Sequence, residues 1–202
     1  MYDRGVENSP ESDVTIFVLA GGKSTRMGTD KAFVEFEGRT LLLGALDLAR
    51  SVSSDVRVVG SREKFGPFAP VLEDIFRDCG PLGGIHAALL AARAKNNVML
   101  AVDMPFVSRE FLEYLIDKAR DAPDAIVVVP RCDGAWQPLC AVYRREFSTA
   151  AESALRAGRN KIDLLFDVVQ TRVIDQKEWE NAGFAANIFR NLNTPEELER
   201  RS

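Results

Sequence analysis

The sequence predicts an α/β fold in which one mainly parallel sheet is covered by helices on both faces. Short apolar segments rich in β-branched residues alternate along the chain with segments of helical periodicity. The first apolar segment, residues 14–20, stops abruptly at a pair of glycines, as a central parallel strand does. The length of 202 residues fits one domain, which we expect to span residues 14–202. Residues 1–13 are polar, and we expect them to form a disordered N-terminal tail.

The expected strands are short apolar segments with β-branched residues. In chain order they are residues 14–20, 34–36, 56–59, 71–72, 97–102, 126–129, 137–143 and 168–174. The segments at 14–20 and 97–102 are almost wholly apolar, which is typical of central strands that are buried on both faces. The segments at 34–36 and 71–72 are expected to be short extended pieces.

The expected helices show apolar residues at a spacing of three and four. In chain order they are a helix from the turn at Gly38 to about residue 50, residues 82–94, a helix that begins after Ser108, residues 146–157, residues 161–166, and a last element that begins at Thr194. Ser108 is a suitable N-cap for an amphipathic helix. Thr194 is a second N-cap, with Pro195 at the first helical position and Glu197 placed for a capping box.

A loop rich in glycine and in cations follows the first expected strand. It contains Gly21, Gly22, Gly28, Lys23, Arg26 and Lys31. Open α/β sheets bind ligands at the carboxyl ends of their strands, which is where this loop lies. Glycine has no Cβ, so these glycines would let backbone N–H groups approach phosphate oxygens closely, while the cations offset the negative charge. The loop therefore predicts a nucleoside triphosphate site; a glycine-rich turn with solvated cations is the alternative.

The spacing in this loop excludes two common phosphate-binding motifs. A P-loop has Lys-Ser or Lys-Thr directly after its last glycine, whereas Gly28 precedes Thr29 and Asp30, and the dinucleotide fingerprint G-x-G-x-x-G is absent. The loop instead resembles the first motif of the molybdenum cofactor guanylyltransferase (MobA-like) family of nucleotidyltransferases, approximately L-A-G-G-x-S-x-R-M-G-x-D-K. The matching residues are Leu19, Ala20, Gly21, Gly22, Ser24, Arg26, Met27, Gly28, Asp30 and Lys31.

The resemblance extends over about residues 14–198 and implies a Rossmann-like, three-layer fold similar to the nucleotide-diphospho-sugar transferases. It implies transfer of GMP from GTP to the terminal phosphate of molybdopterin, with release of pyrophosphate. The implied nucleotide-binding residues are Leu19, Ala20, Gly21, Gly22, Gly28, Lys31, Asp74 and Asp103, and the implied catalytic residues are Arg26, Lys31 and Asp103. A molybdopterin cytidylyltransferase, a sugar-phosphate nucleotidyltransferase and a noncatalytic nucleotide-binding module are the alternatives. Gly21 favours GTP, because the related cytidylyltransferases more often have alanine there.

Asp103 directly follows the apolar strand expected at residues 97–102. If this strand neighbours the first one, Asp103 faces the glycine-rich loop. Magnesium commonly takes only one or two protein carboxylates, while phosphate and water complete its octahedron. The family has its metal-binding aspartate in a similar D-x-P setting, so the resemblance implies a Mg²⁺ cofactor held by Asp103. The alternative is an aspartate that caps the next turn.

An acidic segment precedes the helix expected at residues 82–94, and it resembles the acid followed by G-P-L-x-G in the family. Guanine presents two adjacent N–H donors, which one carboxylate can accept together, so Asp74 is the candidate for contact with the base. Asp78 competes for this role, and a solvated loop acid is the alternative. Where family members often have an asparagine after the second strand, this chain has Ser61, which leaves that contact open.

The second substrate is expected near the end of the chain. Asn191 and Asn193 resemble the N-x-N-T-P motif that the family associates with the pterin, and alternation places both amides on one side of an extended segment. Turn and capping chemistry is the alternative for both residues. Trp136 is a further candidate for a wall of this site, with core packing as its alternative.

Composition excludes several other classes. The net charge of −4 argues against a nucleic-acid-binding surface, and no apolar run approaches the roughly 18 residues of a membrane span. Cys79, Cys132 and Cys140 lack C-x-x-C spacing, which indicates reduced cysteines rather than a disulfide framework or a zinc site. We therefore expect a cytoplasmic enzyme without a signal peptide. The resemblance implies GTP and molybdopterin as its partners, with transient contacts to other cofactor-biosynthesis proteins or apo-molybdoenzymes.

Overall fold

One mixed sheet forms the centre of the protein, whose computed structural model describes residues 13–21 and 30–191. Within these residues the strand order is β10-β7-β9-β6-β1-β4-β5, and β8 pairs with β7. The strands are β1 (Val14–Leu19), β4 (Asp55–Val59), β5 (Val71–Leu72), β6 (Asn96–Ala101), β7 (Val127–Cys132), β8 (Ala135–Trp136), β9 (Cys140–Tyr143) and β10 (Thr171–Ile174). Along this order all neighbours are parallel except β9, which runs antiparallel to both β6 and β7. The predicted mainly parallel sheet is confirmed.

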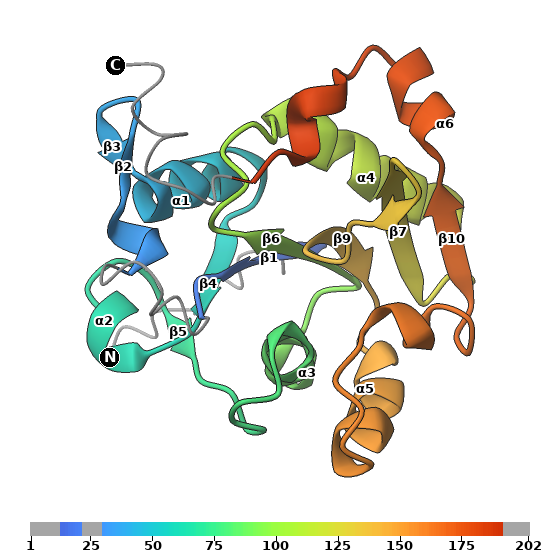
Figure 1. Ribbon diagram of the computed structural model, residues 1–202, viewed down its shortest axis with the longest axis horizontal. Helices are drawn as coiled ribbons and strands as arrows, with labels where there is room; N and C mark the ends of the chain where they lie inside the picture. Colours follow the sequence, from blue (N-terminus) through green and yellow to red (C-terminus); the bar gives the residue numbers. More distant parts are fainter. Residues whose placement is uncertain (1–12, 22–29, 192–202) are drawn as a thin grey trace, which may run out of the picture.

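Helices cover both faces of this sheet, which gives the predicted three layers (Figure 1). One face carries α1 (Leu41–Val52), α4 (Arg109–Asp121) and α6 (Gln176–Asn181), and the other carries α3 (Pro81–Ala91) and α5 (Phe147–Arg156). The short helix α2 (Arg62–Phe65) lies beside β5. The remaining elements are the 3₁₀ helices η2 (Lys31–Phe33), η3 (Asp163–Leu165) and η4 (Ala186–Phe189), and the hairpin of β2 (Glu35–Phe36) and β3 (Arg39–Thr40).

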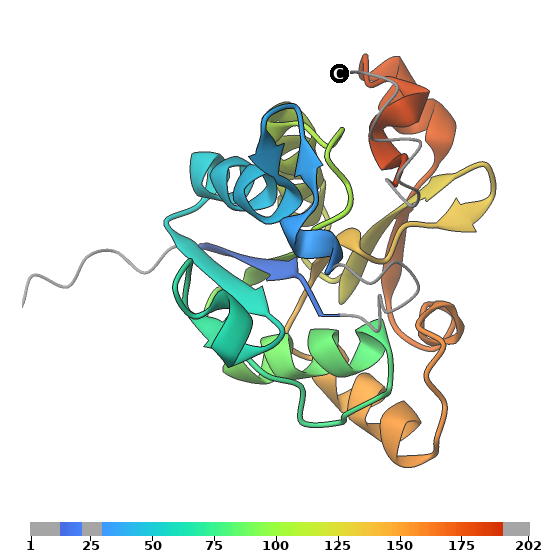
Figure 2. The ribbon, with the colours of Figure 1, turned by 60° about the vertical axis from the view of Figure 1, so that its left-hand side comes forward.

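The core consists of two apolar layers, one on each side of the sheet. Because successive side chains of a strand point to opposite faces, Ile16 and Val18 of β1 pack toward α1 and α4, whereas Phe17 packs toward α3 and α5. Every residue of β1 and β6 is buried. This burial on both faces explains why the two strands are almost wholly apolar in sequence. Figure 2 shows the two helical layers on either side of β1.

Several predicted boundaries were wrong for identifiable physical reasons. The strand expected at 168–174 begins only at Thr171, because the amide N–H groups of Val168 and Val169 donate to Leu165 O in a turn. The helix expected at 161–166 is the shorter η3. The helix expected at 82–94 ends at Ala91, since Ala92 adopts an extended backbone conformation. Residues 1–12 and the element expected from Thr194 lie outside the described residues.

The free cysteines are Cys79, Cys132 and Cys140. Complete burial raises the pKa of Cys140 to about 12, and burial also raises the pKa of Cys132. Neither thiol is therefore activated as a nucleophile. Among the described helices, none is both long and apolar enough to cross a membrane.

His86 lies in α3 and is only 1% exposed. Its ring meets Phe76 edge-on at 5.2 Å between centroids, and within the described residues neither ring nitrogen has a hydrogen-bond partner. Burial lowers the pKa of His86; among the nearby charges, Glu152 raises it and Arg156 lowers it. Folding therefore favours the neutral imidazole.

We expect the protein to lose stability through His86 as the pH falls from about 7 to below the unfolded pKa of about 6.5. Above about pH 7 neither the folded nor the unfolded chain carries a proton on this residue. Below the unfolded pKa of about 6.5, the unfolded chain binds the proton more readily than the folded chain, so the free energy of unfolding falls by up to about 1.4 kcal/mol per pH unit. Urea unfolding of the wild type and of His86→Leu across this range measures the effect. The chain has one histidine. An equal dependence of the free energy of unfolding on pH in both proteins would therefore contradict this prediction.

Candidate active site

The site begins where β1 and β6 end side by side. The two strands are parallel neighbours, with Leu19 in register with Ala101, so their carboxyl ends meet at one edge of the sheet. The neighbourhood on which the prediction for Asp103 depends is therefore confirmed. Lys31 Nζ donates a hydrogen bond of 3.1 Å to Asp103 Oδ2, and the side chains are 25% and 21% exposed. A motif cation and the predicted metal ligand thus lie in contact.

The local fold after β1 brings Lys31 to this position. Asp30 is the N-cap of η2, and its Oδ1 accepts a hydrogen bond of 3.2 Å from the Ala32 amide. The amide of Phe33 donates to the Asp30 carbonyl at 2.9 Å, which closes the turn. Lys31 is the first residue of this turn, so its side chain extends from a capped backbone toward the end of β6.

The backbone amides just after β1 form hydrogen bonds within the sheet edge. The amides of Ala20 and Gly21 both donate to Val59 O, at 3.0 and 3.1 Å. The Gly21 amide therefore pairs with the end of β4. The side chains of Leu19 and Ala20 are buried. A Cβ at Gly21 would lie 3.6 Å from the Gly60 Cα, so this glycine lies close to the end of β4.

Asp74 follows β5 at the same edge of the sheet and lies beside the first turn of α3. A Cβ at Gly83 would lie 3.6 Å from one Asp74 carboxylate oxygen, and a Cβ at Gly84 would lie 3.4 Å from the other. Burial raises the pKa of Asp74, whereas the competing Asp78 is exposed. The structure therefore places Asp74, and not Asp78, in the half-buried position against α3.

The glycines before α3 have separate structural roles. Gly80 has a φ of +64° and forms the N-cap of α3, a backbone conformation that favours glycine. A Cβ at Gly83 would lie 2.7 Å from the Phe76 carbonyl oxygen, so a side chain there would force the backbone to shift. Gly80 thus turns the chain into α3, and Gly83 lets α3 lie close to the Phe76 backbone.

The spacing of the strands sets the distance between the two acidic positions. Asp103 follows β6 and Asp74 follows β5, and β1 and β4 lie between these strands. Three strand spacings amount to about 14 Å. This span is comparable with the length of an extended nucleoside triphosphate.

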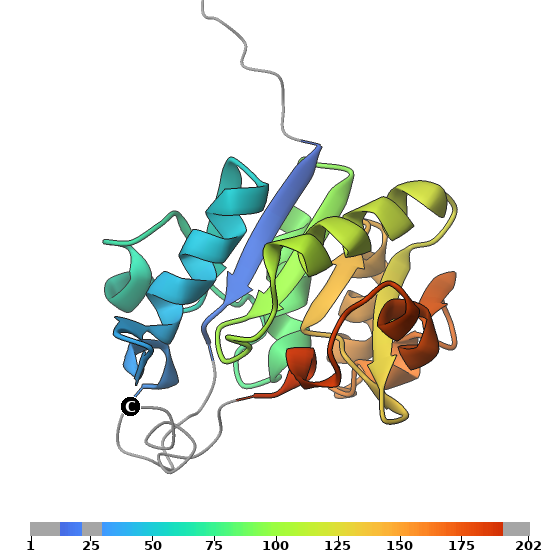
Figure 3. The same ribbon diagram turned by 90° about the horizontal axis from the view of Figure 1, so that it is seen from above.

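Asn191 follows a residue that contacts the loop after Asp103. Its predecessor Arg190 stacks on Phe106 with the guanidinium 5.9 Å from the ring centroid, which brings this segment beside the loop that follows Asp103. Within the described residues the buried Asn191 Oδ1 has no hydrogen-bond partner. Figure 3 shows η4, which precedes Asn191, at the end of the sheet toward which β1 points. Gly22, Arg26, Gly28 and Asn193 lie outside the described residues.

Trp136 and Ser61 have less direct links to the site. The Trp136 ring stacks under the Arg131 guanidinium at 4.5 Å and meets Phe166 at 4.9 Å between centroids. These contacts show that Trp136 packs within its own hairpin and against the core. Ser61 is the N-cap of α2, but its side chain makes no capping hydrogen bond.

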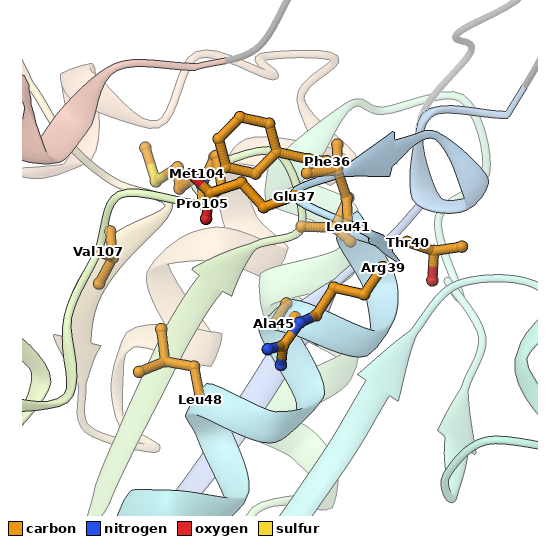
Figure 4. Close-up of a pocket in the computed structure, with 12 residues that line it drawn as sticks. Phe36, Glu37, Arg39, Thr40, Leu41, Ala45, Leu48, Met104, Pro105 and Val107 are labelled. Carbon is orange, nitrogen blue, oxygen red and sulfur yellow. The ribbon is translucent and has the colours of Figure 1, made fainter. Parts of the chain in front are cut away.

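A cavity of about 190 Å³ lies beside the site, between α1, the β2–β3 hairpin and the loop after Asp103 (Figure 4). Its lining is mostly apolar and includes Phe36, Leu41, Ala45, Leu48, Met104 and Val107. Arg39, which also lines it, pairs with Asp47 at 3.1 Å. None of the predicted nucleotide-binding residues that the structure describes lines this cavity, which is therefore separate from the contact between Lys31 and Asp103.

The donor set at the sheet edge fits only one kind of metal site. Among the described residues, no group of three or more His, Cys, Asp or Glu side chains could hold a metal ion. Asp103 is a single carboxylate that remains partly accessible. Such a donor suits a magnesium ion that takes most of its ligands from phosphate and water.

Comparison with known proteins agrees with this geometry. Residues 16–170 match the model of the family described as the MobA-like NTP transferase domain. The chain is 35% identical over 190 residues to the molybdenum cofactor guanylyltransferase of Desulfosudis oleivorans, a match that covers 93% of each chain. It also resembles molybdopterin-guanine dinucleotide biosynthesis protein A of Archaeoglobus fulgidus, with a TM-score of 0.79 and 28% identity over 92% of this chain and 95% of that one. The 2-C-methyl-D-erythritol 4-phosphate cytidylyltransferase of Thermus thermophilus, 19% identical with a TM-score of 0.64 over 91% and 94% of the two chains, shares the fold.

Proposed function

Since this chain belongs to the MobA-like NTP transferase family and is a nucleotidyltransferase, we propose that it transfers GMP from GTP to the terminal phosphate of molybdopterin. Pyrophosphate is the second product. The observation that carries the proposal is the contact of 3.1 Å between Lys31 and Asp103. This contact joins Lys31, at the end of the glycine-rich motif, to the Asp103 carboxylate, which follows the neighbouring strand β6. The group that would neutralise phosphate charge therefore lies beside the group that would bind the metal.

The reaction is an in-line displacement at the α-phosphorus of GTP. An oxygen of the acceptor phosphate forms a bond to this phosphorus, and the bond to the β-phosphate bridging oxygen breaks with its electron pair leaving on pyrophosphate. The acceptor phosphate is already an anion, so no side chain needs to remove a proton before attack. Two anions must be brought together, and catalysis therefore depends on positioning and charge neutralisation.

The proposed roles combine the contact between Lys31 and Asp103 with the resemblance of the surrounding motifs to those of the family. Lys31 stabilises the negative charge at the α-phosphate, and Arg26 of the same motif contacts the triphosphate. Asp103 would hold Mg²⁺, which when bound neutralises charge on the triphosphate oxygens. Asn191 and Asn193 bind the pterin. The free cysteines and the use of GTP support a cytoplasmic location, with transient contacts to the proteins that supply and receive the cofactor.

We propose that Asp74 selects guanine by accepting hydrogen bonds from N1–H and the 2-amino group. Asp74→Asn is expected to lower kcat/KM for GTP by about 10- to 100-fold, because a hydrogen bond to a charged acceptor is lost. Inosine triphosphate lacks the 2-amino group, so the variant should also lose most of the preference for GTP over this analogue. Steady-state kinetics with the two nucleotides measure both effects. Asp78→Asn is the matched control, and loss of the preference in the control alone would transfer the role to Asp78.

The function itself is tested by pyrophosphate release from the purified protein with Mg²⁺, molybdopterin and one nucleotide at a time. We expect release with GTP and a product with the mass of the guanine dinucleotide cofactor. Preference for CTP would indicate a cytidylyltransferase, and turnover with sugar phosphates alone would indicate a sugar-phosphate nucleotidyltransferase. Nucleotide binding without release of pyrophosphate from GTP, CTP or ATP would indicate a noncatalytic module.

A further inference from the structure

The 3₁₀ helix that carries Lys31 packs on α2, a four-residue helix that the sequence did not predict. The ring of Phe33 stacks on Phe65 with 5.8 Å between centroids and an angle of 25° between planes. It also meets Phe68 at 6.0 Å. Figure 1 shows the turn at residues 31–33, drawn in blue, next to α2. The position of Lys31 therefore depends on a surface formed by the segment that follows β4.

A single carboxylate completes this connection. One oxygen of Asp30 accepts the capping hydrogen bond from the Ala32 amide at 3.2 Å. The other oxygen accepts a hydrogen bond of 2.7 Å from Lys64 Nζ, on α2. This hydrogen bond raises the pKa of Lys64, which is the direction expected when the charged ammonium is the bound form. Asp30 thus connects the backbone of η2 to the Lys64 side chain on α2.

The helix α2 is itself held firmly at the sheet edge. Phe65 is only 1% exposed. Its ring lies close to Gly60, because a Cβ added at Gly60 would lie 2.7 Å from a carbon of the Phe65 ring. The Gly60 amide donates to Leu72 O at 2.9 Å, which ties the end of β4 to β5. A residue fixed to α2 is therefore fixed to the same edge that carries the candidate active site.

We propose that Lys64 is a positioning residue for nucleotidyl transfer: through Asp30 it holds η2 so that Lys31 stays within reach of Asp103. This inference rests on the proposed function, in which Lys31 stabilises charge at the α-phosphate. Lys64 itself is about half exposed, at 53%, and an exposed ion pair adds little to the stability of a fold. A displacement of about 1 Å at a catalytic group, by contrast, can lower a rate by about 100-fold. The structure therefore predicts a loss of rate without a matching loss of stability.

The kinetic test compares Lys64→Met with Lys64→Arg. The methionine variant is expected to lose about 10-fold or more in kcat with a smaller change in KM for GTP and a thermal midpoint close to that of the wild type. Arginine retains a cation that reaches Asp30, so it should restore most of the rate. Lys177→Met is the matched control, because Lys177 is an exposed lysine on α6, far along the chain from the site. A kcat for Lys64→Met within about twofold of the wild type would overturn the proposal.

Asp30→Asn provides the second half of a double-mutant cycle. Asparagine still offers an oxygen for the Ala32 amide but no charge for Lys64. If the two residues act through one contact, the double variant should be no slower than the slower single variant. Multiplicative losses of rate would show that Lys64 does not act through Asp30 and would overturn the proposal.

Hydrogen exchange gives a readout that does not depend on turnover. The amides of residues 32–34 are hydrogen-bonded in η2 and its cap. Lys64→Met should speed the exchange of these amides, whereas Lys64→Arg and Lys177→Met should leave it unchanged. The exchange of the amides of α4 should be unchanged in all three variants. If the wild type fails to turn over any nucleotide, the proposed function fails and this comparison alone decides whether Lys64 holds η2. Equal protection of these amides in Lys64→Met and the wild type would overturn the inference.

Discussion

Asp103→Asn is expected to lower kcat for magnesium-dependent pyrophosphate release by about 10³-fold while the protein still folds. Asparagine has the shape of aspartate but lacks the charge that would hold Mg²⁺ and pair with Lys31, 3.1 Å away. Asp103 is 21% exposed and follows β6, so the substitution does not disturb the packing of that buried strand. The expected loss is therefore in chemistry and metal affinity, and only slightly in stability.

The measurement is kcat across a magnesium titration, with thermal unfolding as the check on folding. Asp124→Asn is the matched control, because Asp124 is an exposed aspartate on the loop between α4 and β7. The control should keep the wild-type rate and magnesium dependence. Wild-type turnover by Asp103→Asn at ordinary magnesium concentrations would remove Asp103 from the mechanism.

Lys31→Met is expected to lower kcat by about 10²-fold with a smaller effect on KM for GTP. Methionine keeps most of the apolar length of the side chain, which is 25% exposed, but loses the ammonium group that neutralises charge in the transition state. Steady-state kinetics separate the two parameters. Lys161→Met removes an exposed lysine at a distant loop and serves as the control for the change in net charge. An unchanged kcat in Lys31→Met would exclude a role for this lysine in catalysis.

The contact between Lys31 and Asp103 also predicts how the two substitutions combine. Residues that touch and act as one unit show non-additive effects. The double variant should therefore be much less impaired than the product of the two single losses predicts. Fully multiplicative effects would mean that the two side chains act independently, in spite of their contact in this structure.

Much of the fold could be predicted because the central strands carry a strong signal. Residues of β1 and β6 are buried on both faces, so both strands appear as apolar runs, and their boundaries were predicted to within one residue. The helix α4 shows its N-cap, Ser108, whose hydroxyl accepts from the Phe111 amide at 3.3 Å. The glycine-rich motif was equally informative, since a long match in a fixed order rarely arises by chance.

Other elements gave little local signal. Helix α2 has four residues, of which only Phe65 is buried, so no periodicity reveals it. The antiparallel direction of β9 depends on its hydrogen bonds to β6 and β7, and nothing in its four buried residues encodes that direction. The hydrogen bond from the Gly21 amide to Val59 O depends on the approach of β4, a strand distant in sequence.

The sequence by itself determined the layered α/β fold, the order of its main elements and the loop that marks a nucleotidyltransferase. It did so because burial on both faces and a dense motif are both local in the chain. Only the tertiary structure decided which residues meet: Lys31 with Asp103, which are 72 positions apart, and Asp30 with Lys64, which are 34 apart. Asp74 was distinguished from Asp78 in the same way, by burial against α3. Contacts of this kind depend on the pairing of parallel strands, whose partners are joined through long crossovers and leave no local pattern in the sequence.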